Sequence, residues 1–249
     1  MQLFFYLLIS FLSINLVHAA SQQTVRLTNG EWLPFQSKNL KHYGVASHMV
    51  TEAFASENIK VEYVFMPWKR AYIEAKEGRF DGSLIWSPDP EREKDFLFSD
   101  ILIHGKSVLF HLKSTPFDWK DYSDFVKLKV GGVIGYKYQF ESNKDIKVER
   151  AYSEIAIFKM LINKRVDILP SDLDAGYAIL YDNFSEEEIS KVTHHARPYN
   201  TTTYHLILSK KIKGSGHLMQ LFNTGLKKLK NSGKYDNYLE NSRRGLYRK

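Results

Sequence analysis

Hydrophobic and polar positions along the chain follow two periods, one of two residues and one near 3.6. Runs of alternating apolar residues bounded by Gly, Pro or Asn predict strands. Apolar residues spaced by three and four predict helices that bury one face. In the first half of the chain the predicted strands are 24–28, 60–65, 80–86 and 101–112, and the predicted helices are 43–57 and 68–77.

The second half of the chain repeats this alternation of strands and helices. Strands that alternate with helices favour parallel sheets of the α/β class, and two such runs favour two lobes. The two halves differ too much in sequence to be called an internal repeat. Here the predicted strands are 129–134, 147–151, 166–169 and 201–208, and the predicted helices are 155–163, 172–180 and 214–232.

The first twenty residues form an apolar run without a Lys, Arg, Asp or Glu, and they end in small residues. This composition is typical of a secretory signal peptide cleaved near Ala19 or Ala20, although no basic residue precedes the apolar run. The alternative is an uncleaved N-terminal anchor, but the run is short for a membrane span. Residues 21–249 are therefore predicted to reach the periplasm.

Composition narrows the classes of protein that the chain can belong to. Of its 249 residues 43% are hydrophobic, which is enough for a large core. The absence of cysteine excludes disulfides, thiolate metal sites and a cysteine nucleophile. A net charge of +7 first suggests nucleic acid as a partner, but export and the spread of the basic residues favour a solvated basic surface. Adjacent His194 and His195 lack a third ligand, and we expect neither a metal nor another cofactor.

Residues 87–95 begin like a helix whose first turn carries an arginine. Ser87, Asp89 and Pro90 are typical of a helix start. Arg92 falls near the third helical position, where the partial positive charge of the helix N-terminus disfavours a cation. The arginine at this position therefore needs an explanation.

Residues 68–100 resemble bacterial periplasmic solute-binding proteins of family 3, best known as amino-acid receptors of ABC importers. The resemblance lies in a helix followed by G-x-x-D-G, a strand, S-x-D-P-E-R and F-S-D. Shorter matches extend it, in the same order, over nearly all of the mature chain. They are Trp32-Leu33-Pro34-Phe35, the run from Val130 to Gly135, the run from Lys164 to Asp172, and the run from Leu229 to Tyr235.

The resemblance implies an α/β fold of two lobes, the type II periplasmic-binding-protein fold, with a two-strand hinge. We expect the first lobe to contain residues 21–104 and 205–249, and the second lobe to contain residues 105–204. The ligand would bind between the lobes and favour their closed state, because only that state lets both lobes contact it.

The resemblance also implies how the two ends of a ligand are held. Arg92 matches the arginine that binds the α-carboxylate of the ligand, and a helix N-terminus adds free N–H groups for that anion. Asp172 matches the acid that meets the α-amino group, so the two residues would clamp a zwitterion. The alternatives are structural: Arg92 pairs with a nearby acidic residue on the surface, and Asp172 or Ser171 caps the following helix.

Five further residues are candidates for contact with the ligand. Trp32 and Trp68 could stack on the ligand or cover the cleft, and packing in the core is the alternative for both. Ser87 stands in the motif where the family commonly has Ser or Thr around the ligand carboxylate. Arg70 is either a pocket residue or a charge on a helix surface. Lys137 lies in the turn after the first strand of the second lobe and could add a contact to an anion.

Three departures from the family pattern leave the ligand open. Asp89 stands where a threonine is common, Ile85 where serine or glycine is usual, and Tyr136-Lys137-Tyr138 where small hydroxyl residues often bind the carboxylate. An aspartate near that carboxylate would repel it unless it faces away as a helix cap. A dicarboxylate or a modified amino acid is therefore an alternative to a standard amino acid.

The resemblance predicts a monomeric binding protein, not an enzyme, that captures an amino acid or related zwitterion and delivers it to an ABC permease. One alternative is a sensor or stand-alone binding protein that presents its closed form to a membrane receptor. Another is an enzyme, since the same fold hosts cyclohexadienyl dehydratases, which use a carboxylate in the cleft as acid or base.

Overall fold

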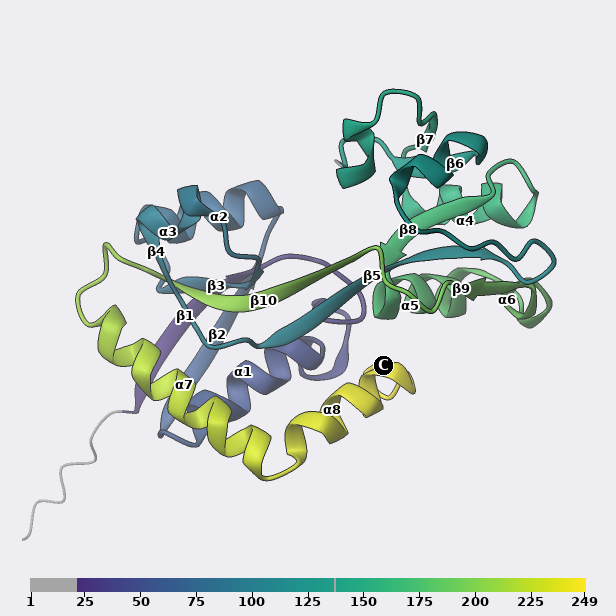
Figure 1. Cartoon of the computed structure of the whole chain (residues 1–249). Coiled ribbons are helices and arrows are strands. Elements are labelled where there is room, and N and C mark those ends of the chain that lie inside the picture. The colour runs from purple at the N-terminus through teal and green to yellow at the C-terminus, as the bar shows by residue number, and fades with distance from the viewer. Residues whose placement is uncertain (1–21, 137) are drawn as a thin grey trace, which may run out of the picture.

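The computed structural model describes residues 22–136 and 138–249, so the predicted signal peptide lies outside the described residues. Figure 1 shows two groups of helices and strands joined by two long strands, and we call these groups the first and the second lobe. The first lobe holds the N-terminal strands and the C-terminal helices. Within the described ranges, none of the helices combines the length and the apolar character that a membrane span needs.

The first lobe is built on three parallel strands. Strand β1 (Gln23–Asn29) lies between β2 (Ile59–Phe65) and β3 (Gly82–Trp86) and pairs in parallel with both. Figure 1 shows helices α2 and α3 above these strands and α1 and α7 below them. The bounds of these helices are Val45–Ala55 for α1, Trp68–Lys76 for α2, Pro90–Asp95 for α3 and Ser215–Asn231 for α7.

Helix α7 forms because its apolar residues recur on one face, as the sequence predicts. Leu218, Phe222, Leu226 and Leu229 are all buried in the core of the first lobe. The ring centroid of Phe222 lies 5.1 Å from that of Phe54 on α1, a favourable distance for two aromatic rings. This packing attaches the C-terminal part of the chain to its N-terminal part.

The second lobe repeats the parallel arrangement. Strand β6 (Val130–Val133) pairs in parallel with β7 (Val148–Ala151) and β8 (Ile168–Asp172). Its core contains the fully buried rings of Phe110 and Phe158. The helices of this lobe are α4 (Glu154–Ile162), α5 (Leu173–Asn183) and α6 (Glu186–Lys191).

Two strands run through both lobes. The first part of β10 (Asn200–Ser209) pairs antiparallel with β5 (Ile103–Leu112), and its second part pairs antiparallel with β3. The second part of β5 continues antiparallel to β8. The sequence predicts parallel sheets, and this is wrong for β5 and β10, because the chain leaves the first lobe on one strand and returns on the other. The predicted lobe boundaries fall within these two strands and stay a prediction.

Most predicted helices and strands are present. The sequence did not predict two three-residue strands, the helix at the C-terminus or the three 3₁₀ turns. Three-residue strands are too short to show a period, and the helix at the C-terminus carries few apolar residues. Strand β8 extends three residues further than predicted, so that Asp172 ends the strand and does not begin the helix. The remaining elements are β4 (Phe96–Phe98), β9 (Val192–His194), α8 (Lys234–Arg243), and three 3₁₀ turns at Lys41–Tyr43, Tyr122–Lys127 and Gln139–Ser142.

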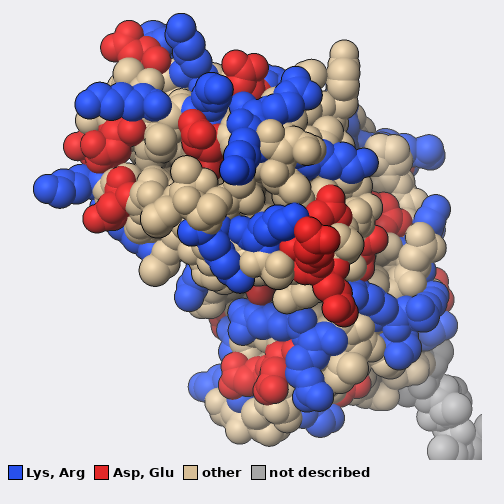
Figure 2. All heavy atoms as spheres, turned by 90° about the vertical axis from the view of Figure 1, so that its right-hand side faces the viewer, with Lys and Arg blue, Asp and Glu red and all other residues tan. Residues whose placement is uncertain are grey.

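The C-terminal segment adds a second contact between the lobes, on the lower side of β5 and β10 in Figure 1. Arg243 Nε lies 3.0 Å from Asp174 Oδ1, and Arg248 Nη2 lies 2.9 Å from Asp182 Oδ1. Both arginines are half exposed, so each pair contributes little to stability by itself. On the face that Figure 2 shows, Lys and Arg are interspersed with Asp and Glu, which agrees with a solvated basic surface.

Two glycines of α7 provide a matched test of this packing. A Cβ atom on Gly225 would lie 2.0 Å from the backbone oxygen of Ala53 on α1, whereas a Cβ atom on Gly216 meets nothing within 4 Å. We expect Gly225→Ala to lower the free energy of unfolding by roughly 2 kcal/mol, because the helices must separate. Gly216→Ala should raise it by up to about 0.5–1 kcal/mol. Urea denaturation measures both changes, and equal stabilities would contradict the close packing of α7 on α1.

Candidate functional site

The predicted helix start at residues 87–95 is confirmed, and Asp89 is its cap. Asp89 Oδ1 accepts a hydrogen bond of 2.9 Å from the backbone N–H of Glu91, and Pro90 is the first helical residue. The carboxylate of Asp89 is therefore used within the helix. Because Asp89 caps its own helix, it need not repel an anionic ligand.

Arg92 is held by the segment before its own helix. Its Nη1 donates to the backbone oxygen of Ser87 at 2.8 Å and to the side-chain oxygen of Ser87 at 3.1 Å. Its guanidinium carbon lies 5.1 Å from the centre of the Trp86 ring, within cation–π range. In the described part of the chain Arg92 has no acidic partner, and Nε and Nη2 make no hydrogen bond. These nitrogens can donate to a ligand.

Strand β3 ends in a strained backbone that directs Trp86 and Ser87 toward Arg92. Ile85 has a φ of 61°, which is rare for a β-branched residue. The pairing of β3 with β10 shifts register at the same place. Ile85 is also the position where the resembling family has serine or glycine. Strain of this kind persists where the surrounding structure enforces it, and it concentrates at functional sites.

Trp68 begins α2 and lies over the loop that follows β1. Its ring covers Gly30 so closely that a Cβ atom on that glycine would lie 2.5 Å from the ring. Its Nε1 donates to the backbone oxygen of Glu31 at 3.4 Å. Its ring meets that of Trp86 edge to face, with 5.5 Å between the centroids. Trp68, Trp86 and Arg92 thus follow one another along one side of the first lobe.

Trp32 contacts a residue of a strand that joins the lobes. Its ring centroid lies 4.7 Å from that of Phe35 and 5.0 Å from that of Tyr204 on β10. Trp32 and Trp68 are both half buried and pack against the core of the first lobe. Core packing therefore accounts for one side of each tryptophan and leaves the other side accessible.

Asp172 caps α5 with one carboxylate oxygen and leaves the other without a partner. Its Oδ1 accepts hydrogen bonds from the backbone N–H groups of Asp174 at 3.1 Å and Ala175 at 3.2 Å. Capping by Ser171 is wrong, because the hydroxyl of Ser171 donates to Glu154 Oε1 at 2.8 Å. Oδ2 of Asp172 is buried and has no hydrogen bond in the described part of the chain. Burial raises the pKa of Asp172 to about 7.

Tyr204 connects Asp172 to Trp32 across the two lobes. A Cβ atom on Gly105 would lie 2.5 Å from the ring of Tyr204 and 3.3 Å from Asp172 Oδ2, so both side chains border this glycine. Burial raises the pKa of Tyr204, and the negative charge of Asp172 raises it further. Trp32 and Asp172 therefore both lie beside Tyr204. In a second group, Trp86 contacts both Trp68 and Arg92, and Arg92 is hydrogen-bonded to Ser87.

Two of the predicted site residues are not part of these clusters. The side chain of Arg70 is 70% exposed and its Nε lies 3.8 Å from Glu74 Oε1, so the structure places it on the helix surface. Lys137 lies outside the described residues. Sequence reasoning missed Trp86, Tyr204 and Glu154. Trp86 directly precedes the S-x-D-P-E-R run, and this adjacency was the one signal that could have identified it.

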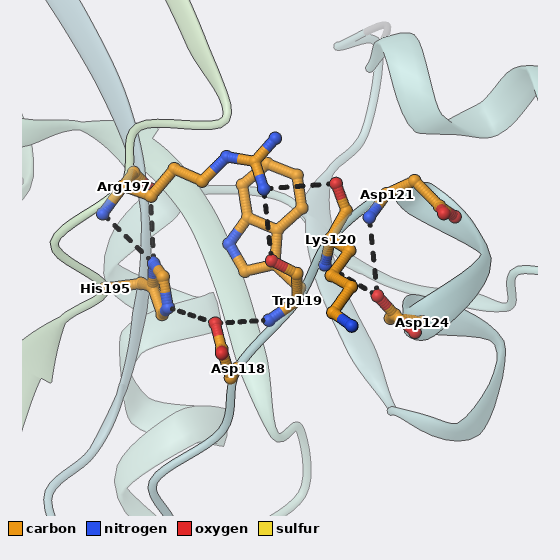
Figure 3. Close-up of polar contacts among 7 residues, drawn as sticks. All are labelled: Asp118, Trp119, Lys120, Asp121, Asp124, His195 and Arg197. Atoms are coloured by element: carbon orange, nitrogen blue, oxygen red, sulfur yellow. Dashed lines mark hydrogen bonds and ion pairs between the residues drawn. The ribbon is translucent and has the colours of Figure 1, made fainter.

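The paired histidines are used within the second lobe. His194 Nδ1 lies 2.8 Å from the hydroxyl of Tyr177, and His195 Nε2 lies 3.3 Å from Asp118 Oδ1. Figure 3 shows His195 beside Arg197, whose guanidinium lies 4.2 Å from the centre of the Trp119 ring. In residues 22–136 and 138–249, no group of three or more His, Cys, Asp or Glu side chains is placed to hold a metal ion.

Two cavities lie near the strands that join the lobes. One of about 560 Å³ is bordered by residues 104–106 and 201–203. The other, of about 450 Å³, lies between α5 and the C-terminal segment. None of the six predicted site residues that the structure describes lines either cavity. The candidate site therefore consists of two groups of residues, Ser87, Arg92 and Trp68 around Trp86, and Trp32 and Asp172 around Tyr204.

Comparisons with known proteins agree with this architecture. The sequence matches the model of bacterial extracellular solute-binding proteins, family 3, over residues 26–241. It is 24% identical over 220 residues to a probable histidine-binding protein of Neisseria gonorrhoeae, covering 84% of this chain and 78% of the relative.

Solved structures that share the fold include the following two. One is the amino-acid ABC transporter substrate-binding protein AbpA of Streptococcus pneumoniae bound to L-arginine, with a TM-score of 0.67, 18% identity, and coverage of 92% of this chain and 98% of that one. The other is a histidine kinase sensor domain similar to periplasmic binding proteins, with a TM-score of 0.67, 16% identity, and coverage of 88% and 96%. The predicted two-lobe fold of the type II periplasmic binding proteins is confirmed.

The raised pKa of Asp172 predicts that this residue lowers the stability of the ligand-free protein. Its pKa rises from 3.8 to about 7 on folding. Between these values the folded protein holds a proton that the unfolded chain has lost, so stability falls as the pH rises. Asp172→Asn keeps the helix cap and removes the charge. We expect it to stabilise the protein by roughly 1–3 kcal/mol at pH 8 and by less at pH 5.

Thermal melts at the two pH values measure this difference. Asp121→Asn is the matched control, because Asp121 also caps a helix but hydrogen bonds from Ser123 lower its pKa. The control should not stabilise the protein. A loss of stability in Asp172→Asn at pH 8 would show that the ionised carboxylate is a structural requirement.

Proposed function

This chain belongs to family 3 of the bacterial extracellular solute-binding proteins, and we propose that it captures an amino acid in the periplasm and delivers it to the permease of an ABC importer. One observation carries the proposal. Arg92 on the first lobe and Asp172 on the second lobe both keep polar atoms without a protein partner in the described part of the chain. An unsatisfied cation and an unsatisfied carboxylate on opposite lobes suit the two charged ends of a zwitterion.

The cation would hold the carboxylate of the ligand. The bond between Ser87 and Nη1 orients the guanidinium and leaves Nε and Nη2 to donate to an anion. Ser87 therefore acts as a positioning residue for Arg92. Trp32 and Trp68 would form the walls of the site with their accessible sides.

The carboxylate of Asp172 would hold the amino group of the ligand. Its unpartnered Oδ2 is buried, and a buried acceptor without a donor is costly. An ammonium group supplies both the missing donor and the missing opposite charge. Because Arg92 and Asp172 lie on different lobes, a ligand that contacts both favours the state in which the lobes are closed.

We further propose that the chain binds its ligand without converting it. Recovery of the bound ligand in unchanged form, shown by mass spectrometry, supports binding alone. Turnover of a prephenate-like substrate would support the dehydratase alternative instead. Presentation of the closed form to a membrane receptor would use the same site, and an uptake assay in cells that lack the permease separates transport from sensing.

A thermal-shift screen tests the proposal most directly. The protein, residues 21–249, is refolded to remove carried-over ligand and screened against the twenty L-amino acids, polyamines, dicarboxylates and short peptides. A rise in melting temperature with one or a few amino acids, growing with ligand concentration, is the expected result. A rise with a dicarboxylate only, or with none of these compounds, would contradict capture of an amino acid.

Substitution of Arg92 should weaken binding of the amino acid that the screen identifies. We expect Arg92→Ala to lower the binding free energy by roughly 2–4 kcal/mol, because a charged partner of the ligand is lost. Arg70→Ala is the matched control, since Arg70 is exposed and lies beside Glu74, and it should leave the affinity unchanged. Isothermal titration calorimetry measures both. Unchanged affinity in Arg92→Ala would exclude this residue from the site.

The affinity should also depend on pH through Asp172. Burial raises the pKa of Asp172 to about 7 in the free protein, and only the ionised carboxylate attracts an ammonium group. Below pH 7 the affinity should fall by up to about tenfold per pH unit, since the ligand must displace a proton. Titrations between pH 5 and pH 8 measure this slope. In Asp172→Asn the affinity should be weak and its slope with pH smaller than in the parent, and an unchanged slope would assign the effect to another group.

A further inference from the structure

Three parallel strands of the second lobe end at one edge of its sheet. Strand β6 lies between β7 and β8, so the carboxyl ends of all three strands meet there. In open α/β sheets ligands bind at this edge. The turn at 134–136 directly follows β6, Asp172 ends β8, and Glu154 begins helix α4 three residues after the end of β7. Glu154 therefore lies on the same edge as the proposed partner of the amino group.

Glu154 is not needed to begin its own helix. The hydroxyl of Ser153 caps α4 by accepting the backbone N–H of Ala156. The carboxylate of Glu154 instead accepts a hydrogen bond of 2.8 Å from Ser171, the residue directly before Asp172. This bond holds the carboxylate beside the end of β8.

Glu154 has no cationic partner in the described part of the chain. Arg150 on β7 is the described basic residue nearest to it in sequence, but it pairs with Glu141 and donates to the backbone oxygens of Val133 and Tyr136. Burial raises the pKa of Glu154, and its charge also raises those of Tyr136 and Asp172. Two carboxylates that lack a cation among the described residues thus share this edge, and the charge of Glu154 disfavours ionisation of Asp172.

We propose that Glu154 is a specificity-determining residue that binds a positively charged side chain, so that the ligand is a basic amino acid. This inference rests on the proposed function. A basic amino acid carries one carboxylate and two cations, and the site offers one cation, Arg92, and two carboxylates, Asp172 and Glu154. A neutral amino acid would leave the carboxylate of Glu154 with its hydrogen bond from Ser171 but without a cation to offset its charge, which costs affinity.

The test compares ligands that differ in the charge of the side chain. L-arginine, L-lysine and L-histidine are titrated at pH 7 against L-citrulline and L-glutamine, and L-citrulline replaces the guanidinium of arginine by a neutral urea group. At least one basic amino acid should bind more tightly than both neutral ones. In Glu154→Gln its advantage over L-citrulline should fall roughly 10- to 100-fold, because a charge-assisted hydrogen bond becomes a neutral one. The affinity for L-citrulline should stay nearly constant.

Two control variants keep the result specific. Glu186→Gln removes the carboxylate of the first residue of another helix, α6, on the same lobe, and it should leave every affinity unchanged. Lys137 lies outside the described residues, so its contacts do not enter the proposal for Glu154. Lys137→Ala removes this basic side chain, and it should not weaken binding of the basic amino acid. Melting curves confirm that each variant is folded, and Glu154→Gln should be at least as stable as the parent because it removes a buried charge.

The outcomes separate this inference from the function on which it rests. Tighter binding of a neutral or acidic amino acid, or an unchanged preference in Glu154→Gln, would overturn the role of Glu154 and leave the binding of amino acids intact. Weaker binding of the basic amino acid in Lys137→Ala would likewise overturn it, since Lys137 would then act on the ligand or on Glu154. Binding of none of the amino acids would overturn the proposed function and this inference together.

Discussion

β5 and β10 pair antiparallel over residues 103–107 and 200–204, and each strand then continues into the sheet of one lobe. The two lobes therefore share a backbone connection of only two strands. A hinge of this kind lets two compact cores keep their packing while their relative orientation changes. The candidate residues depend on it, since Asp172 lies beside β5 and Tyr204 is part of β10.

The second lobe holds negative charge at a cost to its own stability. Burial raises the pKa values of Asp172 and Glu154, and the charge of Glu154 adds to the shift at Asp172. A chain selected for stability alone would replace such groups with apolar or neutral ones. Two carboxylates that have no cationic partner in the described part of the chain lie at the carboxyl edge of parallel strands, where a ligand would compensate them.

The first lobe shows a similar cost in its backbone. Ile85 adopts a left-handed conformation at the end of β3, and the residues after it orient Arg92 through Ser87. Strain in the first lobe and buried charge in the second thus lie on the two surfaces that a ligand would join. Both costs fall where the strands end, whereas the cores beneath them are built from ordinary apolar packing.

The sequence by itself determined the local features of this protein. The alternation of periods predicted most helices and strands, and Asp89 and Pro90 predicted the start of α3, because caps and periodicity depend on residues a few positions apart. Only the tertiary structure decided which oxygen of Asp172 is free, that Ser171 turns to Glu154, and that Arg70 stays on the surface. These outcomes depend on residues that are distant in sequence, and the pairing of β5, β8 and β10 brings them together.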